Sequence, residues 1–265
     1  MKSKTKSDIQ NAAASAKSVI IERANVMTVY LEIAGRAPLI QNNFSQKALE
    51  QMLRKHMGLS VQREKKVPRE VIEQAMIRNT DGRICEPPTA PKKAILTAAG
   101  SIKGVKPWQL RTQLFVEGNS IPITYEKMVP RMDMVRTSGM ARAPDVRFRP
   151  SFDGWKARLG IQYADTVAVQ SVVDLLDRAG NVGIGEWRPE KHGTFGTFRV
   201  VRNITEKAEI EEVVRECMSP LVSLRIPEWA LDAELDPELL KRVFTEQSDS
   251  EEDGDESSDL EKAVG

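Results

Sequence analysis

One stretch of the sequence, from Gly180 to Val200, has residue types and a spacing that suit contact with the backbone of a ligand. Glycine has no side chain, so its backbone adopts positive φ angles and lets another backbone approach closely. Successive backbone amides in such loops bind anions, and phosphate is one candidate. The alternative is a glycine-rich connector that binds nothing. The candidate residues of this loop are Gly183, Gly185, Trp187, Arg188, Lys191, Gly193 and Gly196.

A second candidate is the basic stretch between Glu126 and Leu159, which contains eight cationic and four acidic residues. Its centre, Arg136–Pro144, is rich in small and turn-forming residues, which predicts the tip of a protruding hairpin. A solvated surface without a ligand is the alternative. The cations that we consider for binding are Arg136, Arg142, Arg147, Arg149, Lys156 and Arg158.

Charge combined with flat side chains is what single-stranded nucleic acids require, because the phosphates need a positive groove and the bases need surfaces for stacking. Tyr30, Trp187 and Phe195 are the stacking candidates. Trp187 and Phe195 have a second interpretation, as residues that anchor their loop to the core.

Catalytic and metal-binding motifs are absent from the sequence. It has two histidines, His56 and His192, and lacks a Cys-x-x-Cys pair, a His-Glu-x-x-His motif, a P-loop and a Gly-x-Ser-x-Gly elbow. Gly183 and Gly185 follow a predicted helix rather than a strand, which argues against a dinucleotide fold. We therefore expect binding rather than catalysis, with no cofactor and no metal.

The formal net charge of +1 conceals two opposite parts. Residues 245–265 contain nine acids and one lysine, so this tail carries −8 and the remaining chain carries +9. The Ser-rich acidic composition predicts a disordered tail that modulates binding or recruits partner proteins. The domain boundaries that we expect are a flexible basic arm over 1–23, one binding domain over 24–244, and the acidic tail over 245–265.

Two distant cysteines, Cys85 and Cys217, do not form a disulfide framework, which favours a reducing compartment. The N-terminal residues contain no apolar region of a signal peptide, and no apolar run approaches the roughly 18 to 20 residues of a membrane span. We expect a cytoplasmic protein without a membrane partner.

Hydrophobic periodicity predicts an α+β fold whose core elements follow the order β-α-β-β-α-β. This is the ferredoxin-like or RRM-like order, and it implies large insertions at about 60–108 and 126–154. The predicted elements are a strand over Val26–Ile33, a helix over Gln46–His56, strands near Leu110–Val116 and over Trp155–Tyr163, a helix over Val167–Ala179 ending at Gly180, and a strand over Phe195–Val201.

The strand patterns also predict which residues share the second face of the sheet. Tyr30 and Glu32 alternate with apolar residues on the first strand, as Lys156 and Arg158 do on the third, so these polar residues share one face. An open face of this kind is how RRM domains bind single strands. The alternative is that a second layer, built from the insertions, covers it. Further helices are predicted over Lys92–Ile102 and from Thr205 to Met218.

The glycine loop resembles that of a known family. Gly183-Ile-Gly185, followed after a polar stretch by Gly193-Thr-Phe-Gly196-Thr-Phe198 and a strand, is similar to the C-terminal glycine-rich loop of the RAMP superfamily, the RRM-like backbone proteins of CRISPR ribonucleoprotein complexes. The residues of Gly183–Lys191 and of Ala37–Ile40 also resemble the sequences of a group of poorly characterised tailed-bacteriophage proteins. The specific part of the resemblance covers about twenty residues.

The resemblance implies a phage-encoded protein that binds single-stranded nucleic acid through its glycine loop and a basic hairpin. It implies a role in DNA replication, recombination or genome protection, assembly of copies into an oligomer or filament along the strand, and recruitment of replication or recombination proteins by the tail. The preference for DNA over RNA rests on the acidic tail. The alternatives are an RNA-binding or RNA-processing endonuclease that uses His56 or His192, and a structural scaffold that binds no nucleic acid.

Overall fold

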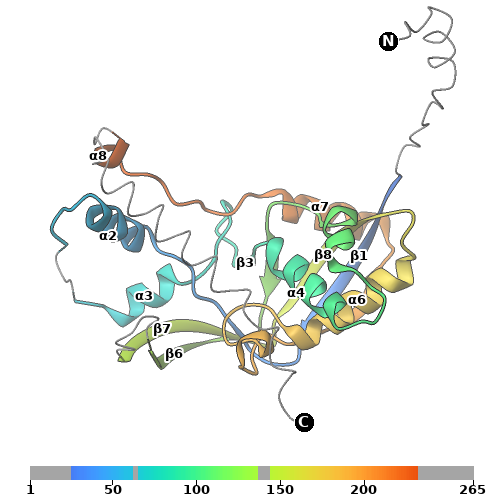
Figure 1. Ribbon diagram of the computed structural model, residues 1–265, viewed down its shortest axis with the longest axis horizontal. Helices are drawn as coiled ribbons and strands as arrows, with labels where there is room; N and C mark the ends of the chain where they lie inside the picture. The colour runs from blue at the N-terminus through green and yellow to red at the C-terminus, as the bar shows by residue number, and fades with distance from the viewer. Residues whose placement is uncertain (1–24, 62–64, 137–143, 232–265) are drawn as a thin grey trace, which may run out of the picture.

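A computed structural model describes residues 25–61, 65–136 and 144–231 of the chain (Figure 1). The strands are β1 (Val26–Gly35), β2 (Leu39–Ile40), β3 (Cys85–Glu86), β4 (Leu114–Val116), β5 (Ile121–Thr124), β6 (Lys127–Arg136), β7 (Pro144–Asp153), β8 (Lys156–Ala164) and β9 (Phe198–Ile204). The helices are α2 (Gln46–His56), α3 (Pro68–Gln74), α4 (Thr89–Gly100), α5 (Pro107–Gln113), α6 (Val169–Val182), the 3-10 helix η1 (Pro189–Lys191), α7 (Lys207–Met218) and α8 (Glu228–Leu231).

Six of the described strands form the larger sheet, in the order β3-β5-β8-β1-β9 with β4 also beside β8. β1 and β8 are antiparallel from the pair Val26–Ala164 to the pair Ala34–Lys156, and β9 runs antiparallel to β1 on its other side. The α+β class predicted from the sequence is confirmed. The first and third predicted strands are the central pair, as a β-α-β-β-α-β order requires.

Alternation along the central strands separates two faces of the sheet. Leu31 and Ile33 on β1, with Leu159 and Ile161 on β8, are at most 2% exposed and point into the main core. Their neighbours in the sequence are polar and lie on the opposite face, because successive side chains of a strand alternate. The periodicity of these two strands thus gave their positions and their buried faces correctly.

Two helices, α4 and α6, pack side by side on the apolar face (Figure 1). The first core helix predicted from the sequence was Gln46–His56, and this assignment is wrong: none of the residues of α2, all of which the structure describes, is buried. α4 takes its place because Ala94, Ala98 and Ala99 present a smooth buried surface on which α6 approaches closely. A stripe of large apolar residues is a strong sign of a core helix in a sequence. A face made of alanines is a weak sign, so the sequence did not distinguish α4 as a core helix.

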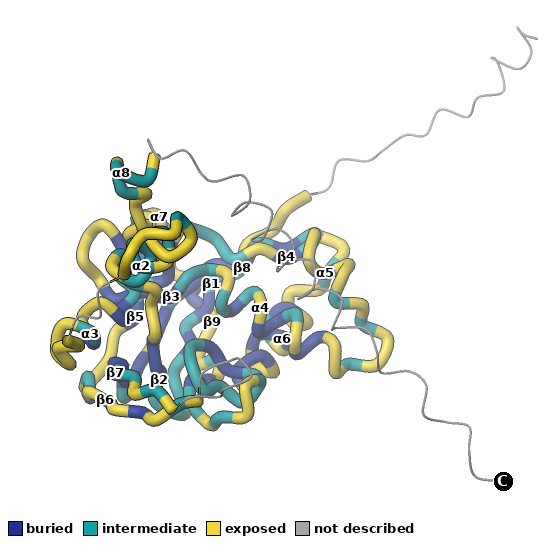
Figure 2. Tube along the Cα trace, turned by 60° about the vertical axis from the view of Figure 1, so that its left-hand side comes forward, coloured by how far each residue is buried: buried dark blue, intermediate teal, exposed yellow. Residues whose placement is uncertain are grey.

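The core continues to the end of the sheet where β1 finishes and β8 begins (Figure 2). Trp155 is 1% exposed, stacks edge-on against Phe198 at 6.1 Å between ring centroids, and donates its indole N–H to the carbonyl of Ala37 at 2.9 Å. Its indole occupies the position where Gly35 lacks a side chain. This tryptophan therefore fixes the turn that follows β1 to the start of β8.

The basic stretch forms the hairpin predicted from the sequence, with β6 and β7 antiparallel over ten residue pairs from Lys127–Asp153 to Arg136–Pro144. β2 pairs with the base of β7, which completes a second sheet of three described strands. The predicted hairpin tip, including Arg142, lies outside the described residues.

Several predicted boundaries differ from the structure. Pro107 begins the helix α5, so only Leu114–Val116 of the expected strand near Leu110–Val116 is extended. The last strand covers Phe198–Ile204, three residues later than predicted. The helix α6 continues through Gly180 to Val182 and ends at Gly183, whose φ of 79° is one that glycine adopts readily.

Gly180 serves packing instead of ending the helix. A side chain at this position would lie 2.0 Å from the carbonyl oxygen of Phe198, so glycine allows α6 to contact β9 closely. Among the described residues, no helix is both long and apolar enough to cross a membrane.

Candidate nucleic-acid interface

The polar face of the large sheet is covered by α7, so the expectation of an open face is wrong. The helix packs against β8 and β5. Ile204, Val213 and Cys217 form a small buried cluster with Tyr30 and Ile210 packed against it. The cover is a helix that follows the last strand, and not a layer built from the insertions.

Tyr30 is a packing residue in this arrangement. It lies half-buried below α7, and its pKa is raised to about 12, first because burial disfavours the phenolate and second because it hydrogen-bonds to Glu117. A base has no open ring face to stack on here while α7 is in place.

Arginines of the sheet are paired with glutamates of α7. Arg158 forms ion pairs of 2.8 Å with both Glu212 and Glu216, and Arg202 of β9 binds Glu32 at 2.8 Å and Glu209 at 2.5 Å. The predicted binding residue Arg158 is thus 27% exposed and already engaged. Pairing raises the pKa values of both guanidiniums and lowers those of Glu209 and Glu212, since each charge stabilises its partner.

A polar cleft of about 620 Å³ opens between this network, the start of β8 and the turn between Arg78 and Ile84. Tyr125 lies at its wall, 42% exposed, and its ring is tilted against that of Phe152 with the two centroids 4.8 Å apart. The carboxylates of the lining are Glu32, Glu209 and Glu216, and the cations are Arg78, Arg83, Lys156, Arg158 and Arg202. The lining therefore has an excess of two positive charges at neutral pH.

Two of these cations, Arg78 and Arg83, belong to a turn that is closed by the bridge between Arg78 and Ile84. The chain after α7 holds this turn in place, because Thr80 donates its amide to Pro220 and Val222 donates its amide to Arg78. Arg83 contacts Glu216 through one guanidinium nitrogen and is 52% exposed. The available signal in the sequence was a cation on each side of the turn-forming residues Asn79–Gly82.

The remaining residues that the sequence missed, Arg202 and Tyr125, had weaker signals. Arg202 lies one residue beyond the predicted end of the last strand, so its face was not assigned. Tyr125 ends a short, mainly apolar segment that contains no motif.

The basic hairpin and the glycine loop meet in space, close to the base of the hairpin (Figure 1). The guanidinium of Arg131 lies 4.7 Å from the ring centroid of Phe195, and that of Arg149 lies 5.6 Å from the ring of Trp187. The rings of Trp187 and Phe195 pack against each other, with their centroids 6.3 Å apart. The two aromatic residues are therefore half-buried anchors of the loop beneath the hairpin.

Arg149 is buried at this junction and is 2% exposed. It lies 3.8 Å from Asp133 and 3.9 Å from Glu186, and two of its nitrogens, Nε and Nη1, have no hydrogen-bond partner among the described residues. Burial lowers its pKa, against the opposing effect of Glu186. In this conformation its guanidinium is inaccessible to a ligand. Two other predicted binding residues are accessible: Arg136 is exposed, and the side chain of Arg147 is 41% exposed.

The backbone amides of the glycine loop are used within the protein. Ile184 donates to Gly196 at 3.0 Å, Gly196 to Pro38 at 2.8 Å, and Glu186 to Ile40 at 2.8 Å. These bonds tie the loop to β2 and to its own two ends. The same amides are therefore engaged rather than available to a phosphate.

The glycines of the loop have the same internal role. A side chain at Gly193 would lie 1.7 Å from the carbonyl oxygen of Trp187, and one at Gly196 would lie 1.8 Å from that of Ile184. Gly185, with a φ of 74°, packs similarly against Ile40, and Gly183 ends α6. Close approach explains these glycines, but the approaching backbone is the protein's own.

The two cations of the loop differ in accessibility. Arg188 binds Glu190 through Nε at 2.7 Å and donates Nη1 to the carbonyl of Gly185 at 2.8 Å. Lys191 is exposed, as is its neighbour His192. His56, the other histidine, ends α2 and is also exposed. In the described part of the chain, no three His, Cys, Asp or Glu side chains are grouped to hold a metal ion.

Of the predicted binding residues, the structure brings Lys156 and Arg158 together in the cleft, and it brings Arg149, Trp187 and the loop glycines together below the hairpin. Tyr30 joins neither group, because α7 encloses it in a separate cluster.

No family model matches the chain, and no curated protein matches it. Among solved structures, the chain is similar to one in a cryo-EM structure of a type III-B Cmr-β complex bound to cognate target RNA, with 13% identity and a TM-score of 0.42. The match covers 74% of this chain and 66% of the other, so it spans just under two thirds of that chain's length.

Proposed function

We propose that this chain is a nucleic-acid-binding protein that holds single strands by their phosphates and stacks bases on exposed aromatic residues. The observation that carries this proposal is the cleft of about 620 Å³, where five cations converge beside an exposed tyrosine. Phosphates contribute most of the affinity of such contacts, and stacking adds to it without regard to sequence.

The glutamates in the cleft do not remove its capacity for phosphate. A guanidinium has five N–H donors, so a carboxylate leaves several of them free. Arg83 uses one nitrogen for Glu216, and Arg83 and Arg202 are 52% and 45% exposed. Lys156 is exposed as well, and no described carboxylate forms an ion pair with it. The carboxylates therefore hold the arginines in position for a phosphate.

The finer parts of the proposal follow from the sequence. We propose a RAMP-like protein encoded by a phage, acting in DNA replication, recombination or genome protection, with single-stranded DNA slightly preferred to RNA because of the acidic residues 245–265. The hairpin cations Arg136 and Arg147 and the loop residue Lys191 remain proposed contacts, since all three are accessible.

A salt-dependent binding assay with labelled single-stranded and double-stranded DNA and RNA tests the function. We expect single strands to bind at low salt, with an association constant that falls linearly with salt on logarithmic axes. Replacing Lys156 and Arg83 with glutamate is expected to weaken binding by about tenfold or more, because each change reverses a charge in the cleft.

Arg69→Glu is the control, since Arg69 is an exposed arginine on α3 that does not line the cleft. Failure of the unmodified protein to bind either strand type at low salt would remove the proposal. Equal effects of the cleft and control substitutions would assign binding to the overall charge instead of the cleft.

One observation favours a second function, a structural role through contacts between copies of this chain. The hairpin face opposite Arg131 and Arg149 is apolar, and Met132, Met134 and Val146 are 71%, 78% and 42% exposed on it. A self-complementary contact across a two-fold axis covers such a face in both copies. Light scattering tests this role: it requires an oligomer that Met132→Glu with Met134→Glu converts to a monomer.

A further inference from the structure

A second basic region lies on the opposite side of the sheet from the cleft. The sequence from Pro87 to Val116 contains five cations and no acidic residue, and it forms α4, α5 and β4. Lys103, Lys106 and Arg111 are exposed. Like charges gathered on one surface repel each other unless counter-charges approach, so the surface favours an anionic partner.

Three cations of this region differ from the arginines of the cleft in having no carboxylate partner in the described part of the chain. Arg158, Arg202 and Arg83 are each paired with glutamates. In contrast, Lys103, Lys106 and Arg111 form no ion pair with any carboxylate that the structure describes. Their full charge is therefore available to a ligand.

Two large aromatic side chains of the same segment are exposed. Trp108 is 63% exposed and Phe115 is 46% exposed. Both belong to a segment that the core holds firmly, because Leu110 and Leu114 are buried at 7% and 2% exposure. The rings are thus presented from fixed backbone, which reduces the entropy lost when a ligand stacks on them.

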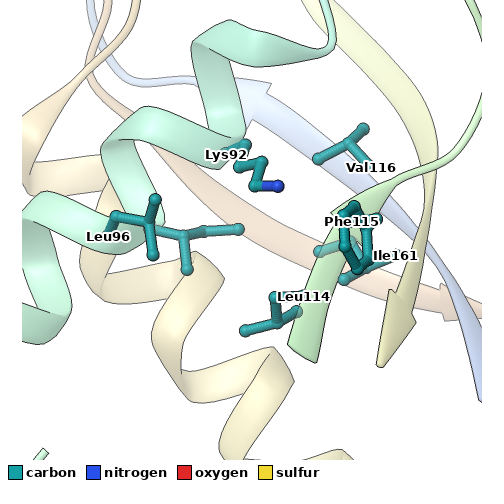
Figure 3. Close-up of a pocket in the computed structure, with 7 residues that line it drawn as sticks. Lys92, Leu96, Leu114, Phe115, Val116 and Ile161 are labelled. Atoms are coloured by element: carbon teal, nitrogen blue, oxygen red, sulfur yellow. The ribbon is translucent and has the colours of Figure 1, made fainter. Parts of the chain in front are cut away.

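Figure 3 shows how α4 and β4 frame the ring of Phe115. The ammonium of Lys92 lies 4.1 Å from the centroid of that ring, in cation–π contact. Leu96 and Leu114 line the apolar hollow beside it. A flat group that stacks on the exposed ring of Phe115 meets an aromatic surface with a cation and apolar side chains beside it.

We propose that this surface, which we term the α4–α5 surface, is a binding site for single-stranded nucleic acid, distinct from the cleft. Its residues are Lys92, Lys103, Lys106, Trp108, Arg111 and Phe115. Bases stack on Trp108 and Phe115, and the lysines and Arg111 bind the phosphates that connect them. The inference rests on the proposed function and adds a second surface to it.

The chemistry of the surface favours nucleic acid over the protein's own acidic tail. Residues 245–265 supply negative charge but contain no aromatic residue. Such a peptide neutralises the lysines and leaves both rings exposed to water. A single strand satisfies the cations and the rings at once, because every base has a face for stacking.

The test measures the binding of labelled single-stranded oligonucleotides by fluorescence anisotropy at several salt concentrations, with the full chain. Trp108→Ala is expected to raise the Kd by about tenfold. Lys103→Ala with Lys106→Ala is expected to weaken binding and to lower the salt slope by about 2. Phe44→Ala and Arg69→Ala serve as controls, because both residues are exposed near α2 and α3, away from α4 and α5 (Figure 1).

Tryptophan fluorescence gives a second readout. Stacking quenches the indole, so an oligonucleotide is expected to quench the unmodified protein more than the Trp108→Phe variant. If Trp108→Ala proves unfolded by circular dichroism, the lysine variants and Trp108→Phe still provide the test.

The outcomes separate this inference from the proposed function. Full binding by the Trp108 and lysine variants overturns the α4–α5 surface and leaves the function in place. Absence of binding by the unmodified protein at low salt overturns both. Quenching of Trp108 by a synthetic peptide of residues 245–265, but not by an oligonucleotide, also overturns the inference, because the tail would then be the ligand.

Discussion

Glu86 on β3 is a carboxyl that the fold has removed from water. It is 3% exposed, and its Oε1 accepts a hydrogen bond of 2.8 Å from Gln41. Burial raises its pKa from 4.5 to about 7, although the bond from Gln41 and the charge of Arg188 act in the opposite direction. The folded protein therefore binds a proton between these two pH values that the unfolded chain releases.

This carboxyl predicts how stability changes with pH. Its contribution to the free energy of unfolding is fully present below about pH 4.5 and is lost as the pH rises to about 7, because protonation favours the folded state there. The loss is on the order of 3 kcal/mol. Glu86→Gln keeps a neutral side chain at every pH, so urea unfolding at pH 5 and pH 8 is expected to show this loss only in the unmodified protein. Equal pH dependence in both proteins would contradict the prediction.

At the scale of elements, α7 is both a structural cover and a source of competing charge. Its apolar side holds it to the sheet through Val213 and Cys217, and its glutamates occupy the arginines of the cleft. If the cleft binds phosphates, these glutamates oppose binding, since like charges repel.

Glu216→Gln is accordingly expected to lower the Kd for a single-stranded oligonucleotide by about two- to threefold at low salt. Glu216 lines the cleft and pairs with Arg83 and Arg158, and the substitution removes its charge at nearly constant shape. Glu211→Gln is the matched control, because Glu211 is on the same helix but is 67% exposed beside Lys207. An unchanged Kd in Glu216→Gln would show that this carboxylate does not compete.

The elements that the sequence predicted well are those in which one strong period acts alone. β1 and β8 alternate cleanly, so their positions, to within two residues, and their buried faces followed from the residues. α7 was expected as a helix, but the sequence did not indicate what its glutamates contact. They pair with Arg158 and Arg202, and only the tertiary structure brings these partners together.

The glycine loop shows a similar limit at the candidate site. Its composition indicated close approach by another backbone, which is correct, but the sequence does not specify which backbone. In the structure, Gly193 and Gly196 accommodate Trp187 and Ile184 of the same loop. The α4–α5 surface, in contrast, has no conspicuous sequence signal. Its cations are spread over a predicted helix and its neighbours and do not form a motif.

At the scale of the whole molecule, charge is divided along the chain. Residues 1–244 carry +9 and residues 245–265 carry −8, although the net charge is only +1. Many arginines of the described residues are neutralised locally, whereas the α4–α5 surface is not. An anionic segment on the same chain competes with phosphates for whatever positive surface remains, at a local concentration that dilution does not change.

Removing residues 245–265 is therefore expected to tighten the binding of single strands at low salt by about tenfold and to have little effect at high salt, because screening suppresses the competition. The measurement is the Kd across a salt series for the full and shortened chains. A full-length variant with the nine acids of the tail replaced by asparagine or glutamine separates charge from length, and we expect it to behave like the shortened chain. If only the shortened chain binds more tightly, the tail blocks the surface by its bulk, and electrostatic competition is refuted.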